Sequence, residues 1–144
     1  MSRDELKEID VSQEILDEIM RNLESLESST DLEGTAIVSK TGLRIASSET
    51  ADVVADIYSA SPATLISLGE KISQDLDQGE LREIVIKGIK GYTIILVTGV
   101  EDHFMLFTNA KKESKLGYYF HKIRKAYENL RPILEKIVSK DTYS

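Results

Sequence analysis

The sequence predicts an α+β fold in which a five-stranded antiparallel sheet lies between helical layers. Apolar residues repeat at helical spacing in three segments and at strand spacing in five, in the order helix, two strands, helix, three strands, helix. The strands within each group are joined by only a few residues, and such short connections join only antiparallel neighbours. At 144 residues, the chain has the usual size of one domain and can bury a core without a disulfide or a metal.

The first helix is expected from residue 11 onward, after a polar and flexible lead-in over residues 1–10. Asp10 is the candidate N-cap, with Gln13 as its partner, and residues 28–31 end the helix. The face opposite the apolar stripe is nearly all Glu and Asp, which is typical of a solvated helix with one buried side. The apolar stripe consists of Val11, Ile15, Ile19, Met20, Leu23 and Leu26.

The five expected strands form a hairpin and a meander. Residues 34–39 and 43–48 flank Lys40-Thr41-Gly42, in which Gly42 is free to adopt the positive φ of a three-residue loop. The meander consists of residues 81–87, 92–98 and 103–109. Its last two strands are apolar or neutral on both faces, as expected of central strands, whereas strands 43–48 and 81–87 carry charges and are expected at the edges.

Two further helices complete the predicted domain, which spans residues 11–138 and leaves 139–144 as a flexible tail. The second helix is expected from Glu49 or Thr50 to about Leu76, with Pro62 kinking it or beginning its second half. The last helix starts near Ser114, and Pro132 kinks or ends it.

The second helix carries no charge over the thirteen residues 57–69, which is too apolar for a helix with one side in water. A helical wheel predicts a sheet-facing stripe of Val54, Ile57, Tyr58, Ser61, Leu65, Leu68, Ile72 and Leu76. One flank has Ala55, Pro62 and Ile66, and the other has Ala60 and Thr64. The outward positions are Asp52, Asp56, Ser59, Ala63 and Ser67. The small residues predict contact with another protein, and burial of the helix by its own chain is the open alternative.

The charges and motifs exclude several functions. The net charge is −7, with eleven acidic and three basic residues in 1–33 but nine basic and three acidic residues in 111–140, so the two ends can complement each other within the fold. This balance argues against binding to nucleic acid. The sequence contains no membrane-spanning stretch and no signal peptide, so we expect a cytoplasmic protein.

No catalytic, metal-binding or cofactor-binding motif is found. The chain has no cysteine, and His103 and His121 lack the spacing of metal ligands. Gly88, Gly91 and Gly99 mark hairpins and do not form a phosphate-binding loop, and no serine lies in a nucleophile elbow. We therefore expect no enzymatic activity and no cofactor.

The order of the elements, together with residues 32–42 (LEGTAIVSKTG) and 79–88 (GELREIVIKG), resembles the Roadblock family of dynein light chains and small-GTPase regulators. The resemblance covers about residues 12–131. The small-residue helix fits it, as does Ser114-Lys115-Leu116-Gly117, where the family often has an Asn-Leu-Gly element. Pro62 and Ser114 depart from the usual pattern of the family. These two departures bear on the geometry of the helices more than on membership of the family.

The resemblance implies the strand order 2-1-5-4-3, with the second helix on one face of the sheet and the first and last helices on the other. It also implies a homodimer in which the third strands pair and the second helices pack side by side. The dimer interface would then involve Ala55, Ala60, Pro62, Thr64, Ile66, Leu81, Ile84 and Ile86.

The expected function is that of a non-catalytic regulator or scaffold. Its helical platform would bind a small Ras-like GTPase, or another Roadblock-type protein, through the five outward positions of the second helix. A motor or cargo adaptor independent of nucleotide state and a small-ligand sensory domain are the alternatives.

Overall fold

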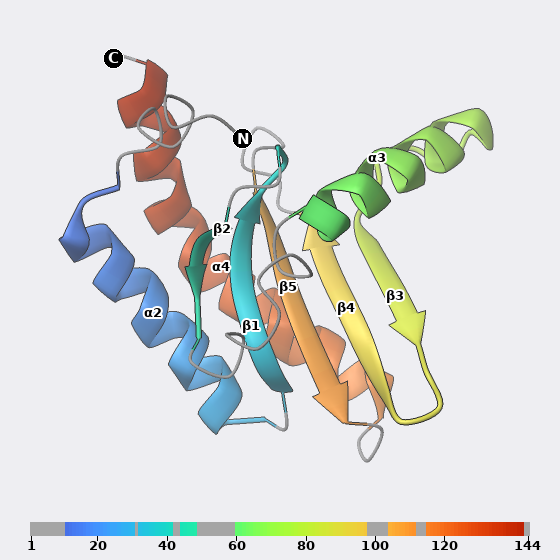
Figure 1. Cartoon of the computed structure of the whole chain (residues 1–144), viewed down its shortest axis with the longest axis horizontal. Helices are drawn as coiled ribbons and strands as arrows, with labels where there is room; N and C mark the ends of the chain where they lie inside the picture. Colours follow the sequence, from blue (N-terminus) through green and yellow to red (C-terminus); the bar gives the residue numbers. More distant parts are fainter. Residues whose placement is uncertain are drawn as a thin grey trace.

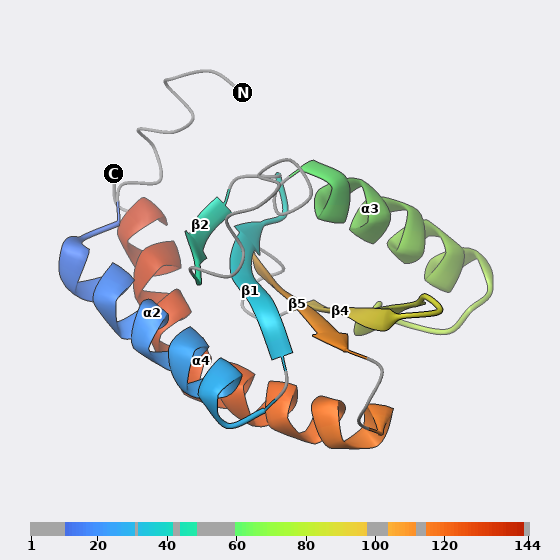
Figure 2. The ribbon, with the colours of Figure 1, turned by 60° about the horizontal axis from the view of Figure 1, so that its bottom comes forward.

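The computed structural model describes residues 11–30, 32–41, 44–48, 60–97, 104–111 and 115–142. These residues form a five-stranded antiparallel sheet with the strand order β2-β1-β5-β4-β3, which confirms the predicted order and places β2 and β3 at the edges. Helix α3 lies on one face of the sheet and extends beyond it, and α2 and α4 lie side by side on the other face (Figures 1 and 2). The elements are α2 (Gln13–Ser28), β1 (Leu32–Ser39), β2 (Arg44–Ser47), α3 (Ala60–Asp75), β3 (Glu83–Lys87), β4 (Gly91–Val97), β5 (Phe104–Lys111) and α4 (Leu116–Thr142).

Helix α2 begins later than the sequence suggested. Its N-cap is Ser12, whose side-chain oxygen accepts a hydrogen bond from the backbone N–H of Ile15, and Gln13 is already inside the helix. Asp10, the predicted cap, lies outside the described residues. The predicted end is confirmed, because the helix stops at Ser28 and Ser29 is its C-cap.

The hydrophobic core has two unequal parts separated by the sheet. The larger part lies between the sheet and the two helices α2 and α4, where Ile37, Ile94 and Leu106 meet Leu23 and other buried residues. The smaller part lies under α3. Strands β1, β4 and β5 contribute alternate side chains to both parts, as expected of central strands. The smaller part consists of Ala36, Val38, Ile66, Ile95, Met105 and Phe107.

Strand β1 contains an irregularity at Gly34. The register of β1 against β5 shifts between Glu33 and Ala36, and Gly34 lies in this stretch with a φ of 65°. Glycine has no Cβ and adopts a positive φ without the steric cost that other residues incur. The glycine therefore allows one strand to bend while both ends remain paired with β5.

We expect the substitution Gly34→Ala to destabilise the protein by about 1 kcal/mol or more, because alanine is strained at this φ. Urea unfolding followed by circular dichroism measures the change. Gly117→Ala is the matched control, since Gly117 lies in the first turn of α4 and a Cβ there would meet nothing within 4 Å. The control variant should be at least as stable as the wild type, and an equal loss in both variants would contradict the explanation.

Helix α4 continues through Pro132 as far as Thr142. Pro132 therefore does not end the helix, and residues 139–142 of the expected tail are helical. Acidic α2 lies beside basic α4, as the resemblance implied, and Lys136 Nζ lies 3.9 Å from Glu18 Oε2. None of the helices in the described part of the chain combines the length and the apolar composition needed to cross a bilayer.

Candidate protein interface on helix α3 and strand β3

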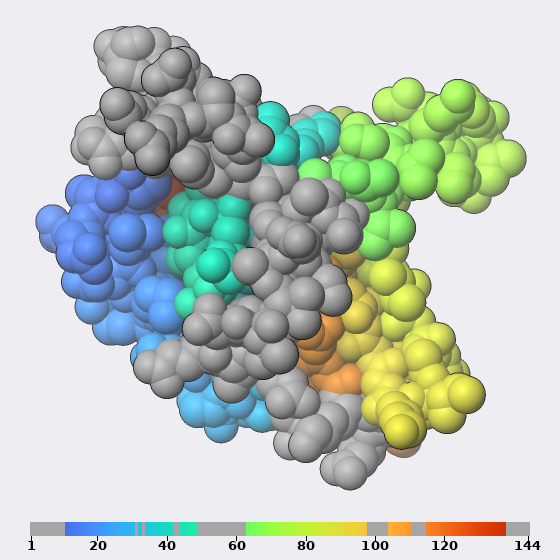
Figure 3. Space-filling view, viewed as in Figure 1, coloured from blue at the N-terminus to red at the C-terminus, as the bar shows by residue number. Residues whose placement is uncertain are grey.

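Helix α3 projects from the body of the molecule as an arm (Figure 3). It is attached to the sheet through Ile66, which is 1 % exposed, and through the half-buried Ala63 and Leu65. Gly69 allows close contact with the start of β3, because a Cβ there would lie 3.0 Å from Leu81 Cδ2 and 3.2 Å from Ile84 Cδ1. The attachment is narrow, so most of the helix surface is free of the sheet.

Polar contacts fix the position of α3 at its side and at its end. Lys40, in the turn after β1, lies 2.8 Å from Glu70 on α3, measured between Nζ and Oε1. The buried Ser73 donates a hydrogen bond from Oγ to the carbonyl of Gly79, and its own carbonyl accepts one from the N–H of Gln78. These bonds reverse the chain from α3 toward β3, with Asp77 and Gly79 at positive φ.

The predicted orientation of this helix is wrong over its described part. Among the members of the expected sheet-facing stripe whose side chains the structure describes, Leu65 is half-buried, whereas Leu68, Ile72 and Leu76 are 57 %, 57 % and 63 % exposed. Val54, Ile57 and Tyr58 lie outside the described residues. Ile66, expected on a flank, is the residue buried against the sheet. The helical wheel failed because it assigns the most apolar side of a helix to the core of its own chain.

Strand β3 provides a second exposed surface next to this helix. Its outer edge is unpaired within the described residues, and Val85 and Ile86 are 38 % and 45 % exposed. The N–H of Gly88 donates to the carbonyl of Gly91, and the carbonyl of Arg82 accepts from Val97. Because the direction of backbone groups alternates along a strand, Ile84 and Ile86 bond toward β4. Val85 and Lys87 therefore direct their backbone N–H and C=O groups to the open edge.

The structure places the outward positions predicted to bind a partner in different environments. Ser67 is exposed, with its hydroxyl donating to the carbonyl of Ala63. Ala63 is half-buried against the smaller core, so it does not face outward as expected. Asp52, Asp56 and Ser59 lie outside the described residues.

The predicted dimer residues are also only partly on the surface. Thr64 and Ile86 are exposed, and Leu81 and Ile84 are half-buried against α3 near Gly69. Ile66 is a core residue of its own chain and is not accessible to a second copy. Ala60 and Pro62 belong to α3, but the structure does not describe their side chains. Ala55 lies outside the described residues.

Sequence reasoning missed the exposed apolar row formed by Leu68, Ile72 and Leu76. These residues lie four apart, on one side of α3, and they are long side chains in water at positions where a lone helix would carry charges. The signal in the sequence was the spacing of Ile66, Gly69 and Ser73, which marks the side that actually faces the sheet. An exposed apolar row beside an open strand edge is the arrangement of a protein–protein interface.

Comparisons with known proteins agree with this fold. The structure is similar to MglB from Myxococcus xanthus, with a TM-score of 0.76, 17 % identity, and coverage of 90 % of this chain and 96 % of that chain. It is similar to the gliding protein MglB from Thermus thermophilus, with a TM-score of 0.74, 16 % identity, and coverage of 89 % and 96 %. A Roadblock/LC7 domain from Streptomyces avermitilis matches with a TM-score of 0.69, 18 % identity, and coverage of 80 % and 96 %.

Sequence comparison adds the assignment to a family. A search of curated proteins found no match. The profile of the Roadblock/LC7 domain matches residues 18–109, which is more than half of the chain and includes most of α2, all of α3 and all or most of each strand. This match and the strand order β2-β1-β5-β4-β3 agree with the resemblance found in the sequence. The chain belongs to the Roadblock/LC7 domain family.

Proposed function

We propose that this protein is a non-catalytic regulator or scaffold that forms a homodimer and binds a small Ras-like GTPase. The observation that carries the proposal is the exposed apolar row of α3 next to the open edge of β3. A monomer in water gains nothing from exposing Leu68, Ile72 and Leu76, each more than half accessible. Covering them with a second protein removes this apolar area from water.

A second copy of the chain fits this surface on two grounds. Antiparallel pairing of two β3 strands would satisfy the outward backbone groups of Val85 and Lys87 in both copies at once, as a two-fold axis requires. The same axis would bring two α3 helices together on one face of the continuous sheet. Both the strand edge and the apolar row would then be covered by one assembly.

The GTPase would bind to the remaining outer surface of the paired helices. Ser67 is the described member of the predicted partner surface that is exposed. Asp52, Asp56 and Ser59 remain predicted contacts, and the two aspartates would attract a basic patch and raise the association rate. Ala63, which is half-buried, would contribute mainly through its packing against the smaller core.

We expect Ser67→Arg to weaken GTPase binding, because a long cationic side chain would obstruct the platform. The readout is capture of the GTPase from native cell extract by the immobilised protein, with GDP and with a non-hydrolysable GTP analogue in parallel. Thermal stability should change little, as is usual for an exposed position. Ser28→Arg is the matched control, since Ser28 is also exposed but lies on α2, on the opposite face of the sheet.

Other outcomes distinguish the alternatives. Capture of a partner without dependence on the nucleotide would favour a motor or cargo adaptor. Loss of the dimer in Ser67→Arg would mean that the outer side of α3 is buried between the two copies, so that the GTPase must bind elsewhere. Equal capture by both arginine variants would exclude Ser67 from the platform.

A further inference from the structure

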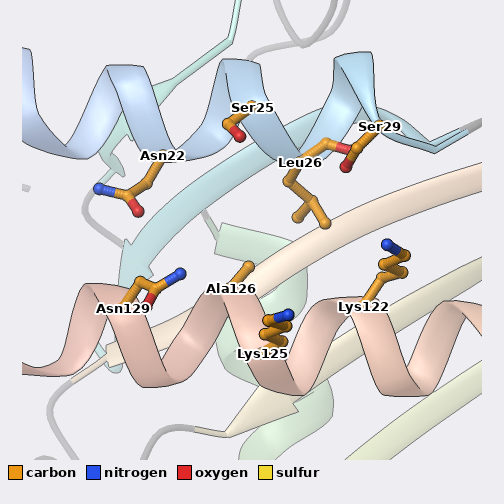
Figure 4. A pocket seen from close by; sticks show the side chains of 8 residues that line it. All are labelled: Asn22, Ser25, Leu26, Ser29, Lys122, Lys125, Ala126 and Asn129. Carbon is orange, nitrogen blue, oxygen red and sulfur yellow. The ribbon is translucent and has the colours of Figure 1, made fainter.

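A groove runs between α2 and α4, on the face of the sheet opposite α3, with a volume of about 210 Å³ (Figure 4). Asn22 points from α2 toward α4, and Lys122 and Asn129 point from α4 toward α2. Leu26 and Ala126 form the apolar floor. The lining consists of Asn22, Ser25, Leu26, Ser29, Lys122, Lys125, Ala126 and Asn129.

Side-chain contacts join α2 and α4 beyond each end of the groove. At one end the hydroxyl of Tyr118 donates to the carbonyl of Ser29 at 3.2 Å. Beyond the other end, Lys136 Nζ and Glu18 Oε2 form the 3.9 Å ion pair. Ser25 and Ala126, between these contacts, are too short to fill the space between the helices. The groove therefore lies between two side-chain contacts that join the helices.

The charges of the groove are unbalanced. Arg124, Arg131 and Lys136 of α4 have carboxylate partners, whereas Lys122 and Lys125 form no ion pair among the described residues. The α2 residues that line the groove are neutral, although that helix is rich in Glu and Asp. The lining thus contains two lysines and no carboxylate, and Lys122 Nζ also lies 5.9 Å from the centroid of the Tyr118 ring.

The groove also offers hydrogen bonds along its length. The amide nitrogen of Asn22 donates to the carbonyl of Glu18 at 2.9 Å, which leaves the amide oxygen of Asn22 to accept a further bond. Asn129 faces it from α4, and Lys122 lies toward the opposite end near Ser29. An occupant that uses all of these groups must be elongated, with carboxylates that reach the two lysines and peptide groups that reach the two asparagines.

We propose that this groove binds an extended acidic segment of a partner protein. Its carboxylates would pair with Lys122 and Lys125, its backbone would bond with Asn22 and Asn129, and an apolar side chain would lie on Leu26. A free phosphate is a poorer match, because it would reach only one end of the groove, and the lining has neither arginine nor a helix N-terminus. The site is on the opposite face from the GTPase platform, so both surfaces can be occupied together.

The test uses a fluorescein-labelled peptide, Glu-Glu-Leu-Glu-Glu, whose binding to the full chain is followed by fluorescence anisotropy at low ionic strength. We expect binding that weakens as salt is added. The glutamine counterpart, Gln-Gln-Leu-Gln-Gln, should bind about tenfold more weakly, and so should the double variant Lys122→Glu/Lys125→Glu, because paired charges are lost or reversed. Ser25→Trp should cause a similar loss without any change in charge, because the indole fills the groove.

The control is Lys90→Glu/Lys115→Glu, which makes the same change in net charge at two exposed lysines outside the groove and outside α3. It should bind the acidic peptide about as well as the wild type, and all variants should retain the circular dichroism spectrum and the oligomeric state of the wild type. Equal affinity for both peptides, or equal losses in the groove and control variants, would overturn the proposal. Displacement of the peptide by inorganic phosphate at a similar concentration would also overturn it, in favour of a simple anion site.

Discussion

Replacing Val85 by proline is expected to convert the proposed dimer into a monomer that remains folded. The backbone N–H of Val85 points away from β4, toward the open edge of the sheet. Proline has no N–H and is tolerated at an edge strand when the lost group faced outward. The variant thus loses a bond to the second copy and keeps the bonds of β3 to its own sheet.

Light scattering in solution measures this effect. The wild-type protein should have about twice the 16.1 kDa mass of the chain, and Val85→Pro should have the mass of one chain. Ile84→Pro is the matched comparison, because Ile84 bonds toward β4 and its side chain packs against the smaller core. This second variant is expected to lose several kcal/mol of stability or to fail to fold.

Two results would contradict the proposed assembly. A wild-type monomer at micromolar concentration would remove the dimer itself. A Val85→Pro protein that is folded and still dimeric would show that the copies do not pair through β3. In that case the apolar row of α3 would have to provide the interface without the strand edge.

Replacing Ile66 by alanine is expected to destabilise the protein by about 2–5 kcal/mol, the usual range for truncating a fully buried isoleucine. Ile66 is 1 % exposed and is the only fully buried apolar residue that the described part of α3 contributes to the smaller core. Since Ile66 is the most deeply buried apolar residue of α3 in the part of the chain that the structure describes, its truncation should also loosen α3. Urea unfolding at several protein concentrations measures the change.

Leu68→Ala is the control for the orientation of α3. Leu68 is 57 % exposed, so within one chain its truncation should change the stability by no more than about 0.5 kcal/mol. Any larger loss should depend on protein concentration, because it would come from the dimer. If Leu68→Ala lost more stability than Ile66→Ala, and this loss did not depend on protein concentration, the result would favour the orientation of α3 that the helical wheel predicted.

The short-range patterns of the sequence were sufficient for most of the fold. The alternation in β4 and β5 identified central strands, and Ile94 and Ile95 are indeed buried on opposite faces of the sheet. The spacing of Ile19, Leu23 and Leu26 gave the buried side of α2. These predictions succeeded because each element buries the apolar side that its own periodicity defines.

The prediction failed where that rule does not hold. In α3 the long side chains of Leu68 and Ile72 point to water, while Ile66 and the small residue Gly69 face the chain's own sheet. A helical wheel cannot distinguish an apolar side that is buried by a second protein from one that is buried in the core of its own chain, because the hydrophobic effect is non-directional. The position of Pro132 inside α4 likewise depends on the packing of Ile133, Leu134 and Ile137 against the larger core.

By itself, the sequence determined the types and order of the elements, the hairpin, the meander and the family resemblance. These features depend on contacts between near neighbours, turn residues and the period of apolar positions. The tertiary structure alone decided which side of α3 is exposed, which backbone groups of β3 face the open edge, and that Lys122 and Lys125 line a groove with Asn22 and Ser25. The physical reason is that these features depend on contacts between residues far apart in the chain, whose relative orientation no local pattern encodes.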